Sequence, residues 1–135
     1  MNSQDIALVR ASWSNVNAIS DQTAEIFYKR LFEVYPEVRP LFKGELDEQG
    51  ERLMRMIGKA VDSLDNLTPV DRVIKMMGAR HSGYGVQDED YEKLRDALLW
   101  TLEQELGADF TPATRSAWMS VYEELADMMR EGAEF

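Results

Sequence analysis

The sequence of 135 residues contains no cysteine and only one histidine, His81. Without cysteine the chain cannot form disulfides, thiolate metal sites or a cysteine nucleophile. A single histidine also excludes every metal centre that requires two imidazole ligands, such as a two-histidine zinc site. These absences leave His81 as the sole imidazole that could bind a metal.

Positive charge is also scarce, because 15 basic residues stand against 25 acidic ones and the formal net charge is −10. A chain this acidic repels nucleic-acid backbones and anionic lipids, so we expect no nucleic-acid partner and no membrane partner. No apolar run approaches the roughly 20 residues of a membrane span. The N-terminus also lacks the basic start and apolar stretch of a signal peptide. We therefore expect a cytoplasmic protein.

Apolar residues recur at helical spacing along almost the whole chain, and no alternating strand pattern interrupts them. Hydrophobic residues make up 44% and charged residues 30%, which is typical of a globular protein. The length fits a single domain over residues 1–135. Helices are expected from Ser3, from Asp21 to Val34, from Pro36 to Phe42, from Asp47 to Leu64, from Pro69 to just before Gly83, from Asp88 to Gly107, and from Pro112 onward.

Residues that cap helices mark several of these starts. Thr68 and Thr111 each precede a proline at the first helical position, where the missing N–H costs nothing. Ser20 and Asp88 are further expected N-caps, and the first helix is expected to be capped near Ser3.

Three polar side chains share helical faces with apolar residues. His81 follows Met77 by one turn, and a buried imidazole there needs a backbone carbonyl or a metal as its partner. Gln49 precedes Leu53 by one turn, so it is either a surface residue at a helix start or a donor that faces a cavity. Tyr28 lies among apolar residues, where a phenol packs against the core or points at a ligand. Spacing alone leaves each alternative open.

Taken in order, these segments resemble the globin family. The resemblance is strongest to bacterial single-domain haemoglobins and flavohaemoglobins, and the fourth helix is also similar to neuroglobins. It implies an all-α globin fold of six to seven helices, a 3-over-3 helical sandwich that encloses haem b (iron protoporphyrin IX). The similar segments are residues 27–32 and 35–42 for the B and C helices, 49–67 for E, 80–86 for the end of F, 98–100 for G and 117–118 for H.

The resemblance also implies roles for individual residues. His81 matches the proximal ligand of the haem iron, with its second ring nitrogen bonded to a carbonyl near Met77. Tyr28, Gln49 and Leu53 match the three distal positions that shape the gas-binding pocket.

Further residues match positions around the haem itself. Phe42 matches the phenylalanine that stacks on the macrocycle, and Arg52 and Arg80 match positions near the propionates. The rest of the expected lining is apolar or aromatic: Met56, Met77, Val86, Tyr91, Leu94 and Leu125.

The function implied is reversible binding of O2, CO or NO at a five-coordinate ferrous haem, in oxygen storage or transport, with no catalytic residue. Hydrogen bonds from Tyr28 and Gln49 would give high O2 affinity. Nitric oxide dioxygenase activity supported by a separate reductase is the alternative, ahead of a gas sensor or a haem-free interaction module. We expect a monomer or weak homodimer.

Two departures from the flavohaemoglobin pattern limit this expectation. The position of its late glutamate in the last helix corresponds here to Ala133, which disfavours peroxidase-like activation of oxygen. No flavin or nicotinamide domain follows in this sequence, so electrons are expected from elsewhere.

Overall fold

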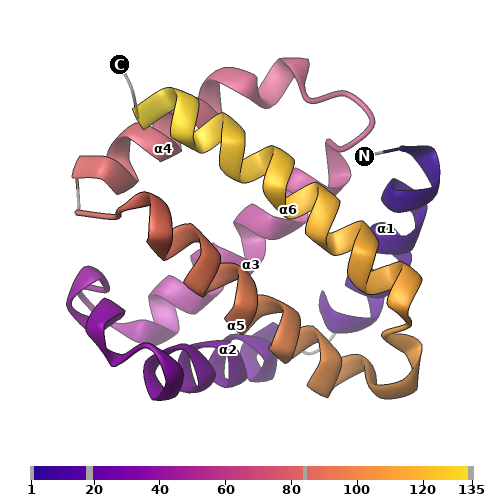
Figure 1. Cartoon of the computed structure of the whole chain (residues 1–135), viewed down its shortest axis with the longest axis horizontal. Coiled ribbons are helices and arrows are strands. Elements are labelled where there is room, and N and C mark those ends of the chain that lie inside the picture. Colours follow the sequence, from indigo (N-terminus) through magenta and orange to yellow (C-terminus); the bar gives the residue numbers. More distant parts are fainter. Residues whose placement is uncertain (1, 18–19, 84, 134–135) are drawn as a thin grey trace.

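The computed structural model describes residues 2–17, 20–83 and 85–133. Within these ranges all regular structure is helical, which confirms the expected all-α class (Figure 1). The elements are α1 (Ser3–Asn17), α2 (Ser20–Val34), η1 (Pro36–Leu41), α3 (Leu46–Asp62), η2 (Thr68–Val70), α4 (Asp71–Gly83), α5 (Asp88–Leu106), η3 (Gly107–Asp109) and α6 (Pro112–Ala133).

Two helices begin with a reciprocal capping arrangement one residue earlier than expected. The Asn2 side chain accepts from the Asp5 N–H at 2.9 Å while the Asp5 carboxylate accepts from the Asn2 N–H at 3.2 Å, so Asn2 caps α1. At α5 the cap is likewise Gln87, whose N–H donates to Asp90 at 2.8 Å. Because such a box pairs residues three apart, the acid in the first turn identifies the cap. The cap expected near Ser3 is therefore its neighbour Asn2, and the choice of Asp88 was wrong.

The expected caps at the two proline starts have different outcomes. Thr111 accepts a hydrogen bond from the Thr114 N–H at 3.2 Å and does cap α6. Thr68 instead lies inside the short η2 turn, where its own N–H donates to the Asn66 side chain at 3.2 Å. The expected cap at Ser20 falls on a side chain outside the described part of the structure.

The core consists of two clusters. The larger one joins α1, α3, α5 and α6, and in it Trp118 donates from Nε1 to Ser12 Oγ at 2.8 Å. The second cluster is aromatic and joins α2 and η1 to α5; it is built around Phe27, Tyr28 and Leu31. The second cluster matters for function because it contains Tyr28, one of the candidate site residues.

Helix α4 packs mainly on α6, and the two lie side by side in Figure 1. A Cβ atom added to Gly78 would lie 2.6 Å from Met129 Cα, and one added to Gly132 would lie 2.6 Å from Lys75 Cα. The two helix backbones therefore touch at a crossing that only glycine permits. This crossing fixes the position of the helix that carries His81.

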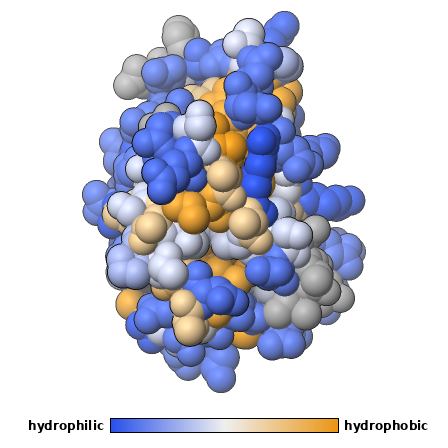
Figure 2. All heavy atoms as spheres, turned by 90° about the vertical axis from the view of Figure 1, so that its right-hand side faces the viewer, coloured by the Kyte–Doolittle hydropathy of each residue, from blue (hydrophilic) through white to orange (hydrophobic). Residues whose placement is uncertain are grey.

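The surface agrees with the acidic, polar composition. The face in Figure 2 is mostly hydrophilic, with hydrophobic atoms gathered in a narrow band. Among the described helices, none combines the length and apolar character needed to cross a membrane.

Candidate functional site

His81 lies in the last turn of α4, half-buried, with its Nδ1 atom 2.6 Å from the Met77 carbonyl oxygen. A carbonyl can only accept, so Nδ1 carries the proton in this contact, and in the neutral imidazole the lone pair then lies on Nε2. The structure records no hydrogen bond for Nε2 within its described residues. The expected contact with Met77 is thus present, and it orients an imidazole whose other nitrogen is free to bind a metal.

A single imidazole does not make a complete metal site. The described residues contain no group of three or more histidine, cysteine or carboxylate side chains that could hold an ion. A metal at His81 would therefore have to bring most of its own ligands, as the iron of a porphyrin does. The donor set at this position fits haem better than a bare ion.

Tyr28 lies in α2 and is buried, with a residual exposure of 6%. Its ring stacks on Phe32 with centroids 5.9 Å apart and meets Phe42 edge-on at 5.5 Å. The structure records no hydrogen bond for its hydroxyl among the described residues. Burial raises the pKa of Tyr28 to about 12, although the charge of Arg52 acts in the opposite direction. The result is a phenol that stays protonated and keeps its O–H available to a ligand.

Alkaline titration should reveal this burial. The pKa values of Tyr28, Tyr35, Tyr91 and Tyr122 are all raised, mainly by desolvation, so the phenolates form later in the folded chain than in the unfolded one. We expect ultraviolet phenolate absorbance to lag behind that of the denatured protein from pH 10 upward, and Tyr28→Phe to remove one group that titrates near pH 12. Because these pKa values are raised, the associated stability is present at neutral pH and is lost as the pH rises toward them. If the titration curves of the folded and the denatured protein coincided, the burial of these tyrosines, Tyr28 included, would be contradicted.

Gln49 lies in the first turn of α3 and is half-buried. Its side-chain nitrogen donates to the Lys43 carbonyl in the loop before the helix. An amide nitrogen has two hydrogens, and the structure records no hydrogen bond for the second one among the described residues. Nothing in the sequence indicated this hydrogen bond between the Gln49 amide and the Lys43 carbonyl.

The expected haem-lining residues other than Tyr91 share an intermediate degree of burial. Three of them (Phe42, Leu53 and Leu94) pack at the edge of the aromatic cluster, and Leu125 packs at the edge of the larger one. Burial of the apolar surface that these residues still expose would contribute roughly 25 cal/mol per Å². A flat apolar group that packs against them would gain this free energy on binding. The seven half-buried apolar residues are Phe42, Leu53, Met56, Met77, Val86, Leu94 and Leu125.

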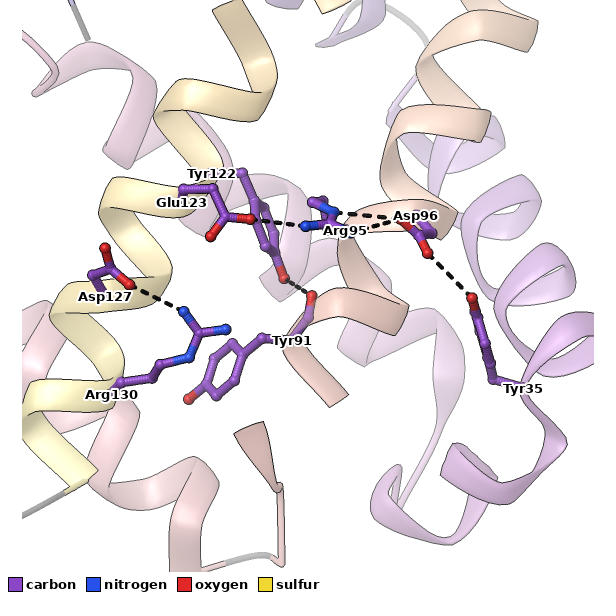
Figure 3. Close-up of polar contacts among 8 residues, drawn as sticks. All are labelled: Tyr35, Tyr91, Arg95, Asp96, Tyr122, Glu123, Asp127 and Arg130. Carbon is purple, nitrogen blue, oxygen red and sulfur yellow. Dashed lines mark hydrogen bonds and ion pairs between the residues drawn. The ribbon is translucent and has the colours of Figure 1, made fainter. Parts of the chain in front are cut away.

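Tyr91 is buried in α5 beside a polar network between α5 and α6 (Figure 3). The Arg130 guanidinium lies 5.0 Å from the Tyr91 ring centroid, and the Tyr122 hydroxyl donates to the Tyr91 carbonyl at 2.6 Å. Farther along, Arg95 pairs with Glu123 at 2.9 Å. These contacts hold α5 against α6, with the Tyr91 ring facing the Arg130 guanidinium.

The two arginines expected near the propionates, Arg52 and Arg80, are both exposed. Within the described residues the structure records no ion pair for either of them. Both are therefore free to pair with an anionic group.

Sequence reasoning overlooked Gly50 and Gly78, which position the site. A Cβ on Gly50 would lie 2.9 Å from Ala24 Cβ and 3.6 Å from Tyr28 Cε2, so this glycine lets α3 approach α2 beside the phenol. Gly78 does the same for α4 against α6. The signal that could have revealed them is glycine inside a helix, which costs about 1 kcal/mol relative to alanine and therefore calls for a reason.

The globin family model matches residues 25–129, and this chain belongs to the globin family. Membership implies haem binding and gaseous ligands such as O2 and NO. Among curated relatives, neuroglobin from Tetraodon nigroviridis is 27% identical over 146 residues, covering 98% of this chain and 92% of its own. Neuroglobin from Chaenocephalus aceratus is 26% identical with the same coverage.

A solved structure from Rhodothermus marinus matches with a TM-score of 0.89 and 28% identity, covering 99% of this chain and 94% of the other. That protein is an engineered carbene transferase described as a "putative nitric oxide dioxygenase". The match confirms the globin fold expected from the sequence.

Proposed function

We propose that this globin binds O2 reversibly at a five-coordinate ferrous haem b ligated by His81. The observation that carries the proposal is the His81 imidazole, whose Nδ1 is fixed on the Met77 carbonyl while no hydrogen bond is recorded for Nε2 within the described chain. A bound haem would supply the iron that takes the gas. The chain supplies the imidazole, the apolar walls and the hydrogen-bond donors.

The apolar residues would hold the macrocycle by burial. Phe42, Leu53 and Leu94, which pack at the edge of the aromatic cluster, would contribute to this lining. The other proposed lining residues are Met56, Met77, Val86, Tyr91 and Leu125. The exposed guanidinium group of Arg52 would pair with a propionate. The other expected partner, Arg80, follows Met76 by one helical turn on the exposed side of α4 and is therefore less suited to this role.

Tyr28 would act as the main donor to the gas. Its protonated hydroxyl has no recorded protein partner among the described residues, so a ligand with partial negative charge can accept from it without breaking another bond. Gln49 would contribute less, because its amide already donates to Lys43. We therefore propose high O2 affinity that depends chiefly on Tyr28.

Visible spectra of the purified chain with stoichiometric hemin test this function. We expect a Soret band to develop on addition of hemin, and dithionite to give a high-spin, five-coordinate ferrous spectrum, because no second histidine can bind the iron. Exposure to O2 or CO should then shift the band reversibly. A low-spin ferrous spectrum without added ligand would contradict five-coordination, and absence of any Soret band would contradict haem binding itself.

The structural likeness to the Rhodothermus marinus protein favours nitric oxide dioxygenase activity as a second candidate. In that reaction one NO, one O2 and one electron give nitrate, so sustained turnover needs an electron donor. Measurement of NO consumption by the haem-loaded chain, with and without a reductase, separates the two functions. Turnover that continues through many cycles with the reductase would favour the enzyme, and consumption that stops after one equivalent would favour the oxygen-binding protein.

A further inference from the structure

The outer side of α4 carries an exposed strip formed by Arg72, Val73, Met76, Ala79 and Arg80. Val73 is 54% exposed and Met76 is 49% exposed, which are high values for large apolar side chains. At about 100° per residue, this strip points away from both the α6-facing Gly78 and the site-facing His81. Helix α4 lies at the edge of the molecule, so the strip is accessible (Figure 1).

The strip is basic on a strongly acidic protein. The structure records no ion pair for Arg72 or Arg80 within the described residues. The nearby acid Asp71 is already held by Lys75 at 3.1 Å, and Lys75 also meets Glu131 of α6 at 3.5 Å. The strip thus combines two exposed apolar side chains with two guanidinium groups that pair with no described residue, in a chain whose net charge is −10.

We propose that this strip docks an acidic amphipathic segment of another protein. Arg72 and Arg80 are eight residues apart, or about 12 Å along the helix axis, so the complementary segment carries carboxylates about two helical turns apart. Its apolar side chains lie between these carboxylates and cover Val73 and Met76. The charge complementarity selects an acidic partner, and the apolar centre supplies burial.

A second copy of the strip is a poor occupant. Two-fold symmetric pairing of α4 with α4 places Arg72 opposite either Arg80 or Arg72 of the other copy, so like charges meet in either direction. Charge therefore favours an acidic partner over self-association.

The test uses the full isotope-labelled chain and a synthetic helical peptide of about 15 to 20 residues, with leucines on one face flanked by two glutamates eight positions apart. A second peptide carries lysine in place of both glutamates. We expect the acidic peptide to shift the amide resonances of residues 72–80 saturably, with affinity that falls as salt is added. The lysine peptide should leave these resonances unchanged.

Three variants show whether the strip is responsible. Arg72→Glu should weaken binding of the acidic peptide about tenfold, because an attraction becomes a repulsion, and Met76→Ser should weaken it through lost burial. Arg115→Glu is the matched control, because Arg115 is an exposed arginine on α6 that forms no ion pair with any described residue, and the charge change is the same. The proposal would be overturned if all three variants weakened binding equally, or if the shifts lay outside residues 72–80. It would also be overturned if the strip resonances shifted with protein concentration in the absence of peptide, which would indicate self-association. Binding of a short DNA duplex as strong as that of the acidic peptide would overturn it as well.

Discussion

Replacement of Tyr28 by phenylalanine is expected to accelerate O2 release from the haem-loaded protein about ten- to a hundredfold. A hydrogen bond to a group with charge is worth about 1.5 to 3 kcal/mol, and each 1.4 kcal/mol is a factor of ten. The phenol is well suited to this role because it is 6% exposed, stays protonated and has no recorded partner within the described chain. Phenylalanine keeps the ring packing against Phe32 and Phe42 and removes only the donor.

Flash photolysis and stopped-flow mixing measure this rate. Tyr35→Phe is the matched control, because it also removes one phenol oxygen, but the Tyr35 hydroxyl donates to Asp96 at 3.2 Å instead of toward the site. Release of CO, a less polar ligand, should change much less than release of O2. If Tyr28→Phe left the O2 rate within a factor of two of wild type, the distal assignment of Tyr28 would be wrong.

The helices and the orientation of His81 could be predicted from the sequence because both depend on local spacing. A one-turn separation placed the Met77 carbonyl within reach of the imidazole, and the structure shows that contact at 2.6 Å. The apolar period and the Pro112 start likewise located α6. These features follow from helix geometry and do not depend on how the helices pack.

The environment of Gln49 could not be predicted in the same way. Its spacing from Leu53 places it on α3, but its hydrogen bond goes to the Lys43 carbonyl in the preceding loop. The path of a loop depends on tertiary contacts that a periodic pattern does not encode. The sequence therefore indicated the residue and its helix, while its bonding partner came only from the structure.

Helix crossings were also beyond the sequence. Apolar periodicity shows which face of α4 is buried, yet it does not reveal that Gly78 touches Met129 and Gly132 touches Lys75. Gly78 and Gly132 are 54 positions apart in the sequence, so their shared role at the crossing is visible only once the packing of α4 on α6 is known. This contact fixes the position of α4 relative to α6, and with it the position of His81.

Replacement of Gly78 by alanine is accordingly expected to destabilise the fold by about 3 kcal/mol. Overpacking costs typically about 1 to 3 kcal/mol, and here the new methyl group meets backbone atoms of Met129, which cannot rotate away. The gain in helix propensity, about 1 kcal/mol, is too small to offset the clash. Urea denaturation followed by circular dichroism measures the change, and the displaced α4 should also weaken hemin binding.

Gly83→Ala is the control, because Gly83 ends the same helix and a Cβ there meets nothing within 4 Å. This variant should be neutral or slightly stabilising, so an equal loss from both substitutions would refute the crossing as the cause.

Gly132→Ala approaches the same crossing from α6 and should cost about as much as Gly78→Ala. Because either methyl group already forces the two helices apart, the double variant should lose clearly less than the sum of the two single losses. Additive losses would mean that the two glycines act at independent contacts, and the position of His81 would then not depend on one shared crossing.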